Sequence, residues 1–531
     1  MQKIEIIFPQ EILDQILSHL NVNQLFSCLL TNRYWCRLTV PFIWSSPFHN
    51  LNLTKNNNKF SSLIKIYISC LQKNDKLLLE QFGLDLSNFS SSPLFNYVEF
   101  LKVLDYKLLE EYVVNVIRNT LKAEDKILIN VVMAIMKSLC NMFMGDKPTL
   151  KNLILSFNGQ ILPEILLPNE YNSGLMNLQK IKFFVGSFNR SKLKNILEFL
   201  EAIPRISPNI TCLDIDVNFM DKIMADALVS LIERLNHLTN FKLREKSGGR
   251  QIIEKAINNL SSRALSLTLL ELHNVHFHDL PLTGLAECKK LENLLIIQCC
   301  CLTYSNWQPL EDAKFPLKIL YLDSDFGPEV TISILKSTKS NQSIKQLHLS
   351  SATKNIIEIL ANLCSGLIHL DICVNNFSLP FIKNMIFELK ELQYLTIMKF
   401  GIHNPRTLDL GNIHTSFLHY LEINFILTIE QLDALLSHCQ APLKTLILNQ
   451  YLDKYQKADE YFLIILKFAK EKGTLKRLCI SHDGISINNN YNNNNNNNNC
   501  NNDQPEVMKE LLKYVQILPY NEVRINIYEF L

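Results

Sequence analysis

Two short stretches hold the side chains best suited to metal or redox chemistry. The stretch HNVHFH places His273, His276 and His278 close together, and QCCC places cysteines at positions 299 to 301. Imidazole and thiolate are the usual zinc ligands, but a zinc site needs several of them converging on one point. For neither stretch does the sequence show an evident set of further metal ligands. We therefore expect turn histidines and a buried structural cysteine, with no metal site and no cofactor.

Motifs for intrinsic catalysis are missing from the sequence. No HExxH, G-x-S-x-G, P-loop or G-x-G-x-x-G pattern occurs, and 14 glycines are too few for a Gly-rich architecture. The formal charge of +2 over 531 residues gives no indication of binding to nucleic acid or to an anionic membrane. We therefore expect a protein that is not an enzyme.

Targeting signals are also missing. The first eight residues, MQKIEIIF, do not resemble a secretion signal, and no apolar run reaches the roughly 18 residues of a membrane span. The 14 cysteines include no C-x-x-C pair, which indicates reduced, buried thiols. These features favour the cytoplasm and/or the nucleus.

Most of the chain follows one repeating pattern, L-x-x-L-x-L. The spacing between successive units is mostly 23 to 29 residues, with two intervals of 32. In each unit the last two apolar positions flank one outward residue, as in a short strand. Segments with helical spacing lie between the strands, for example 354–364, 379–389 and 429–439. The units begin at Leu150, Leu178, Ile210, Leu238, Leu267, Leu291, Leu317, Ile344, Leu367, Leu392, Leu418, Leu443 and Leu475.

This series resembles the leucine-rich-repeat family over residues 146–531. A spacing of 23 to 29 residues is typical of such repeats, and each repeat buries its apolar face only by stacking on its neighbours. The family usually has Asn or Cys after the strand, and Asn158, Asn218, Cys299 and Asn375 fit this position. The resemblance implies an α/β fold, namely a curved solenoid with a parallel β-sheet on the concave face and helices on the convex face.

Recognition of a partner is then expected on the concave face, at the positions between the buried leucines. Basic and acidic residues alternate along the first repeats, and aromatic residues appear in the later ones. Tyr and Arg are favoured anchors at protein interfaces. The alternative is that these residues form only a solvated surface. The predicted substrate-binding residues are Lys180, Lys182, Asp214, Asp216, Lys242, Arg244, Tyr321, His369, Tyr394 and Tyr420.

The first 45 residues differ from the repeats. In FPQEILDQILSHL, apolar residues recur along one face of a predicted helix that starts after Pro9 and ends near Asn21. A second apolar segment, NQLFSCLLTNRYWCRL, follows, and then VPFIW.

These residues resemble the F-box, a small helical module, through FPQEILDQIL, LLTNRYWCRL and PFIW. Phe8 stands where the family usually has Leu, and Cys36 is displaced from its usual place before an arginine. F-box modules dock on a Skp-family adaptor, which links them to cullin and RING subunits. A module of about 45 residues cannot bury so many apolar side chains alone. The predicted adaptor-binding residues are Phe8, Pro9, Ile12, Leu13, Ile16, Leu17, Leu20, Leu25, Leu29 and Trp35; the alternative is that they pack against residues 46–145.

The order of the two regions implies a function. An F-box followed by leucine-rich repeats is the architecture of substrate-recognition subunits of SCF-type cullin–RING ubiquitin ligases, in which the repeats bind a substrate protein. The alternatives are a repeat scaffold without ligase coupling and an enzyme with an unrecognised site. We expect an F-box at 1–45, a helical linker and cap at 46–145 and the solenoid at 146–531. An Asn-rich stretch, 487–504, is expected to be a disordered loop, followed by a helix at 506–518 and a last strand at 523–530.

Overall fold

The computed structural model places most of the chain in regular elements. It describes residues 9–49, 57–82, 84, 86, 93–121, 125–146, 149–156, 173–186, 190–218, 222–245, 256–277, 282–340, 342–399, 417–449, 458–482, 485–486 and 506–525. The predicted Asn-rich loop, 487–504, lies outside these residues. The chain divides into two compact units, residues 1–266 and 267–531, and each is described by itself.

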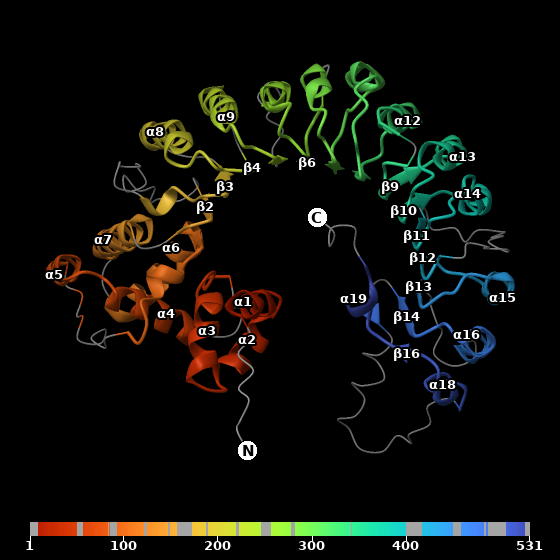
Figure 1. The fold of residues 1–531 in the computed structure, drawn as a ribbon, viewed down its shortest axis with the longest axis horizontal. Helices are drawn as coiled ribbons and strands as arrows, with labels where there is room; N and C mark the ends of the chain where they lie inside the picture. The colour runs from red at the N-terminus through yellow and green to blue at the C-terminus, as the bar shows by residue number, and fades with distance from the viewer. Residues whose placement is uncertain are drawn as a thin grey trace. The chain divides into compact units, whose positions relative to one another are not determined.

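The first unit begins with helices. Three short ones open the chain, and further helices follow (Figure 1). Asn21 starts the second helix with a capping box, because its side chain accepts from the Gln24 N–H while the Gln24 side chain accepts from the Asn21 N–H. The helices are α1 (Gln10–Ser18), α2 (Val22–Leu29), α3 (Arg33–Ile43), α4 (Asn57–Ser69), α5 (Lys73–Gln81), α6 (Tyr106–Leu121) and α7 (Asp125–Met144).

The rest of the first unit is a parallel sheet with helices on one face (Figure 1). Its strands pair in chain order, and α6 packs against the second of them. Successive repeats are also joined just before each strand, where the N–H groups of Gln179 and Lys180 both donate to the Lys151 carbonyl. The strands are β1 (Val103–Asp105), β2 (Asn152–Ser156), β3 (Lys180–Val185), β4 (Cys212–Val217) and β5 (Asn240–Glu245), with helices α8 (Arg190–Ile206) and α9 (Lys222–Arg234).

The second unit repeats this arrangement. Its strands again pair in parallel and in chain order from β6 to β14, with helices on one face (Figure 1). The strands are β6 (Leu269–His273), β7 (Asn293–Ile297), β8 (Ile319–Asp323), β9 (Gln346–Ala352), β10 (His369–Val374), β11 (Tyr394–Lys399), β12 (Tyr420–Asn424), β13 (Thr445–Asn449) and β14 (Arg477–His482). The helices include α11 (Tyr304–Trp307), α12 (Pro328–Lys336), α13 (Lys354–Leu363), α14 (Ile382–Glu388), α15 (Ile429–His438), α16 (Ala458–Lys472) and α18 (Glu506–Leu511).

The predicted register is confirmed in every repeat. Each strand from β2 to β14 begins two residues after the predicted start of its repeat, as β13 does after Leu443. All the predicted starting residues are buried, with at most 1% of their surface exposed. The helices predicted at 354–364, 379–389 and 429–439 are present as α13, α14 and α15. The predicted fold class is therefore confirmed: N-terminal helices precede a parallel-sheet array covered by helices on one face.

Three elements differ from the prediction. Strand β1 pairs with β2 from within the segment expected to be a helical linker, and its three residues are too few to show a repeat pattern. The last strand, predicted at 523–530, is wrong where the structure describes it. Val523 ends a short helix, α19 (Tyr520–Val523), and Arg524 and Ile525 follow in no regular element. A short strand, β16 (Gln516–Ile517), instead pairs with β14, within the segment expected to continue as a helix to residue 518.

Candidate functional site

The three N-terminal helices share a small apolar core. Leu17, Leu25 and Ile43, one from each helix, are buried in contact with one another. Around them pack side chains that stay partly exposed, including Leu20, Leu29 and Trp35. The core thus takes up the inner stripe of each helix and leaves the outer stripes uncovered.

The outer stripes are apolar as well. On α1, Ile12 and Ile16 lie one helical turn apart and are 43% and 48% exposed. On α2 and its C-cap, Phe26 and Leu30 repeat this spacing, and Leu30 is 80% exposed. Tyr34 on α3 is also exposed. Each of the three helices therefore presents large apolar side chains to solvent, which is typical of a surface that binds another protein.

The predicted adaptor-binding residues fall into three classes. Leu13, Leu17 and Leu25 are buried. Pro9, Ile12 and Ile16 are exposed, whereas Leu20, Leu29 and Trp35 are half-buried. Phe8 lies outside the described residues. The other large apolar side chains exposed on these helices are those of Phe26, Leu30 and Tyr34. They were not in the predicted set, although the i, i+4 spacing of Phe26 and Leu30 could have indicated these two.

The small helical region is joined firmly to the helices that follow it. Trp44 is the C-cap residue of α3, and its ring lies 4.0 Å from the Tyr97 ring and 5.5 Å from the Tyr67 ring, measured between ring centroids. Phe48 is buried, and its carbonyl accepts a hydrogen bond from the Tyr112 hydroxyl. The apolar residues after α3 therefore pack on residues 46–145, whereas the outer stripes of α1 and α2 do not.

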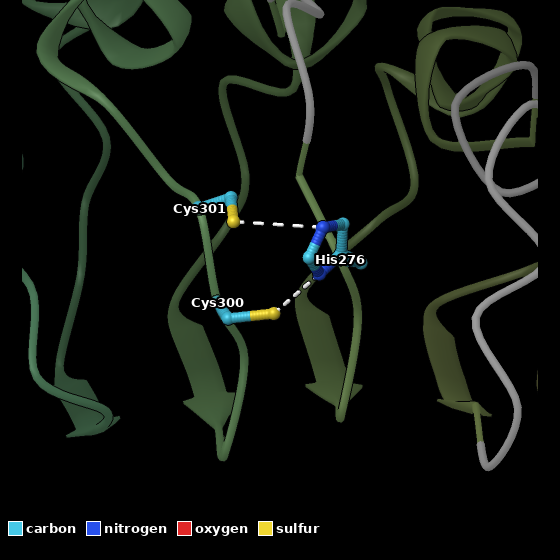
Figure 2. Close-up of side chains that lie close together, drawn as sticks. All are labelled: His276, Cys300 and Cys301. Carbon is cyan, nitrogen blue, oxygen red and sulfur yellow. Dashed lines mark hydrogen bonds between the residues drawn. The ribbon is translucent and has the colours of Figure 1, made fainter.

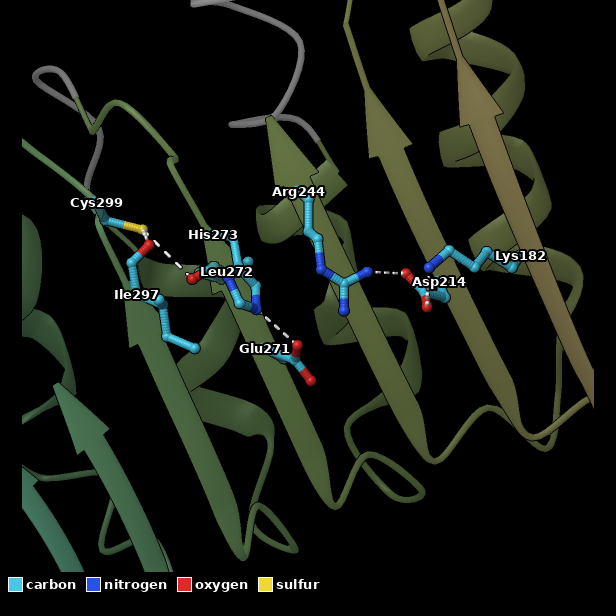
Figure 3. A network of polar contacts seen from close by, with 8 residues as sticks. All are labelled: Lys182, Asp214, Arg244, Glu271, Leu272, His273, Ile297 and Cys299. Carbon is cyan, nitrogen blue, oxygen red and sulfur yellow. Dashed lines mark hydrogen bonds and ion pairs between the residues drawn. The ribbon is translucent and has the colours of Figure 1, made fainter. Parts of the chain in front are cut away.

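The second candidate surface is the sheet face opposite the repeat helices, which we call the open face. In the first unit it carries a charged row across three strands, Lys182 on β3, Asp214 on β4 and Lys242 on β5, which occupy one register. Figure 3 shows the Asp214 carboxylate between Lys182 and Arg244. Its two oxygens lie 3.4 Å from Lys182 Nζ and 2.6 Å from an Arg244 guanidinium nitrogen. One carboxylate thus links cations from both neighbouring strands.

Asp214 and Asp216 lie on the predicted face, but they are buried rather than available to a partner. Their short side chains lie between longer ones on β3 and β5, with Lys182, Phe184 and Arg244 among the register neighbours. The four predicted basic residues remain half-buried. The accessible charge on this part of the open face is therefore positive. The cations are Lys180, Lys182, Lys242 and Arg244.

In the second unit the open face carries stacked aromatic and histidine rings. The Tyr321 and His348 rings are parallel at 3.9 Å, and His348 Nδ1 lies 2.8 Å from an Asp371 carboxylate oxygen. His369 stacks on Tyr394 at 5.5 Å. Tyr321 and Tyr394 are half-buried, but His369 is buried, which corrects its prediction as an accessible residue. Burial lowers the His369 pKa to about 4, because the imidazolium loses hydration there.

A segment of the chain itself covers the open face of β12 to β14. Val523 packs against Tyr420, Ile447 and Cys479, and Tyr520 and Ile525 add to this contact. Tyr420 is consequently buried, so its predicted availability to a substrate is wrong in this structure. We call residues Leu518–Ile525 the covering segment.

The covering segment is also held by polar contacts. The Tyr520 hydroxyl donates to Glu422 Oε1 at 2.7 Å, and the Tyr420 hydroxyl donates to Glu422 Oε2 at 2.8 Å. The Ile525 N–H donates to the Tyr420 oxygen at 3.4 Å. Burial, together with the Glu422 charge, raises the pKa of both tyrosines. A buried carboxylate with hydroxyl donors from two elements fixes the position of the segment. No local pattern could have indicated this contact, because Tyr520 and Glu422 are 98 residues apart.

The His and Cys stretches meet in the second unit (Figure 2). His276, Cys300 and Cys301 each offer a ligand atom, and these atoms lie within 4.8 Å of one another. Cys299 occupies the turn position expected from its repeat, since its thiol accepts from the Val275 N–H and donates to the Leu272 carbonyl (Figure 3). Cys300 and Cys301 are exposed, which corrects the expectation of buried thiols at these two positions.

Comparisons with known proteins agree with the N-terminal geometry. The model of the F-box-like family matches residues 8–50. No curated protein matches the chain. Among solved structures, an internalin from Listeria monocytogenes has 14% identity and a TM-score of 0.26, covering 55% of this chain and 70% of its own. A protein from Bacteroides fragilis has the same identity and TM-score, covering 64% of this chain and 76% of its own.

A TM-score of 0.26 is too low to support a shared fold, so the repeat fold is assigned from the strand register of this chain alone. Among the helices that the structure describes, none is both long enough and apolar enough to pass through a bilayer. The chain has an F-box-like domain near its N-terminus, followed by a long parallel-sheet array of the leucine-rich-repeat type.

Proposed function

We propose that the protein is the substrate-recognition subunit of an SCF-type cullin–RING ubiquitin ligase. The observation that carries this proposal is the uncovered apolar surface of α1 to α3, which lies within the F-box-like match at residues 8–50. Exposed apolar side chains at helical spacing favour docking into a groove on a partner. In this proposal the partner is a Skp-family adaptor, which connects the chain to cullin and RING subunits.

The adaptor contact is assigned by exposure. Ile12, Ile16, Phe26 and Leu30 would reach into the adaptor, with Pro9, Tyr34 and the half-buried Leu20, Leu29 and Trp35 at the margin. Phe8 stays in the proposed contact from the sequence alone. Leu13, Leu17 and Leu25 would act indirectly, because their burial holds the three helices together.

The chain itself would supply binding and no chemistry. Ubiquitin transfer belongs to the RING subunit and its charged partner enzyme, and the repeats bring the substrate close to them. This division of work requires two surfaces on one chain, one for the adaptor and one for the substrate. It needs no cofactor and no catalytic residue here.

For the substrate we propose a protein with an acidic segment that binds the open face of the first unit. The accessible charges there are the cations at positions 180, 182, 242 and 244, while the two carboxylates of β4 are buried between them. Opposite charges across an interface speed the encounter of the two proteins and fix how they align on each other. Half-buried Tyr321 and Tyr394 add candidate anchors on the second unit.

The test is affinity purification of the full chain from cells in which cullin ligase activity is blocked. Three baits are compared: wild type, Ile12→Asp with Ile16→Asp, and Lys242→Glu with Arg244→Glu. We expect adaptor and cullin to be lost from the second bait only, and substrate proteins from the third only. If substrate proteins are captured but no bait retains an adaptor, the chain is a repeat scaffold without ligase coupling. If no bait captures either class, the proposed function is wrong.

A further inference from the structure

Two turns of neighbouring repeats bring an imidazole and two thiols together. His276 follows β6, and Cys300 and Cys301 follow β7 (Figure 2). The His276 Nδ1 atom lies 2.6 Å from Cys300 Sγ, and the Nε2 atom lies 3.5 Å from Cys301 Sγ. The ring therefore stands between the two sulfur atoms, 24 and 25 residues away in the sequence.

The backbone under this cluster is fixed by hydrogen bonds. The Cys300 N–H donates to the Val275 carbonyl at 3.0 Å, and the Phe277 N–H donates to the Cys300 carbonyl at 2.9 Å. His276 and Cys300 thereby form an isolated parallel bridge. Cys301 has a φ of +60°, in the left-handed region that a cysteine rarely adopts. That conformation holds two consecutive cysteines near the same ring, although adjacent side chains in a strand would point to opposite faces.

The donor set fits a borderline-soft metal ion. Zinc prefers thiolate and imidazole ligands, with bonds of about 2.3 Å and 2.0–2.1 Å in a tetrahedron. Those bonds place sulfur and nitrogen about 3.5 Å apart, which is the distance from Cys301 Sγ to His276 Nε2. Cys300 Sγ lies beside the other ring nitrogen, so its side chain would rotate toward Nε2 to join the same ion. Such a rotation exchanges one staggered rotamer of an exposed side chain for another and moves only the sulfur.

The exposure of the cluster makes it accessible to an ion. Cys300 and Cys301 are exposed, whereas every other cysteine in the described part of the chain is buried or half-buried. Burial raises the pKa of the Cys364 thiol, for example, to about 12, which keeps it protonated and unreactive.

We propose that His276, Cys300 and Cys301 form a zinc site with three protein ligands and a fourth position open to solvent. Binding would release one proton from each thiol, so that the two thiolates balance the charge of Zn²⁺ and the neutral imidazole donates a lone pair. The ion would join the turns that follow β6 and β7. This site is independent of the adaptor surface and of the proposed substrate.

The test is zinc binding by the full chain, kept reduced, stripped with a chelator and titrated against a chromogenic zinc indicator. We expect wild type to bind one ion per chain at this site. His276→Gln, Cys300→Ser and Cys301→Ser should each weaken binding by at least about tenfold, because loss of even an outer-shell partner of a metal ligand typically costs about 10- to 100-fold in affinity. Replacing zinc by Co²⁺ should give a sulfur-to-cobalt charge-transfer absorption in wild type that is weaker in each single cysteine variant and absent when both cysteines are replaced.

Matched controls keep the result interpretable. Cys212→Ser removes a half-buried thiol and His438→Gln an exposed imidazole elsewhere, and both should bind like wild type. Far-ultraviolet circular dichroism shows that each variant is folded. The proposal is overturned if wild type binds no ion, or if the variant lacking all three ligands binds as tightly as wild type.

Discussion

At the residue scale, the open face is organised by polar side chains that the fold has buried. Asp214 contacts cations from two neighbouring strands, and only 4% of its side chain is exposed, against 23% for Lys182 and 25% for Arg244. Screening by water is weak at such a carboxylate, so the contact stabilises the sheet more than a surface ion pair does. Asp214 therefore acts in this unit as a support for the basic residues and not as a partner contact.

Replacing Asp214 tests this role. In Asp214→Ala, Lys182 and Arg244 lose their shared carboxylate, and we expect the free energy of unfolding to fall by about 1–3 kcal/mol. Glu201→Ala is the matched control, since it removes an exposed carboxylate that lies 4.0 Å from the Arg234 guanidinium, and should change stability by less than about 0.5 kcal/mol. Urea denaturation measures both. Equal shifts in the two variants would contradict the role.

His369 predicts a dependence of stability on pH. Its pKa in the folded protein is about 4, below the usual 6.5, so the unfolded chain binds the proton first as the pH falls. Stability should therefore decrease between about pH 6.5 and pH 4, by up to about 1.4 kcal/mol per pH unit from this group. Urea denaturation across that window should show a smaller slope for His369→Gln than for wild type. The exposed control His438→Gln should keep the wild-type slope, and an unchanged slope in His369→Gln would refute the assignment.

Sequence reasoning at this scale predicted the face of each side chain but not its accessibility. Strand alternation correctly placed Asp214, His369 and Tyr420 opposite the helices, because the side-chain period in a strand is two. Their burial depends on neighbours from other strands or from the covering segment, and no spacing within one repeat contains that information. The same limit hid the meeting of His276 with Cys300 and Cys301, which depends on the register of two repeats.

At the scale of elements, the covering segment is the part of the fold that alters the proposed binding surface. It closes the open face of β12 to β14 through Val523 and the Tyr520–Glu422 hydrogen bond. Repeats β2 to β14 were predictable because each one carries its own apolar pattern. The covering segment belongs to no repeat, so its place on the sheet was not predictable.

A charge inside this contact should displace the segment. In Val523→Asp, a carboxylate would face Tyr420, Ile447 and Cys479 without a partner, which is unfavourable in an apolar contact. Burial and the nearby Glu422 raise the Cys479 pKa to about 12 in the native protein. Release of the segment should therefore speed alkylation of Cys479 by at least about tenfold, as more thiolate forms.

Peptide mass spectrometry distinguishes Cys479 from the exposed cysteines in this experiment. Glu522→Ala changes the exposed neighbouring position on α19 and should alkylate at the wild-type rate. If Val523→Asp stays folded and Cys479 reacts no faster than in wild type, the segment does not control access to this face.

At the scale of the whole molecule, the proposed function requires two binding surfaces of different character on one chain. The F-box-like domain offers apolar side chains on short helices, and the open face of the repeat strands offers polar and aromatic side chains. A stacked array stabilises each repeat through its neighbours, so side chains on its face can vary without loss of the fold. That separation suits a receptor whose adaptor is fixed and whose substrate is specific.

The most direct test of this account is the affinity of the purified full chain for a purified Skp-family adaptor, measured by calorimetry. Ile12→Asp with Ile16→Asp should weaken binding at least about 100-fold, because both side chains would enter the adaptor groove. Ile129→Asp, on α7, is the matched control, since Ile129 and Ile12 are both 43% exposed, and it should bind like wild type. Failure of wild type to bind the adaptor, or equal affinity in the double variant, would contradict the central claim.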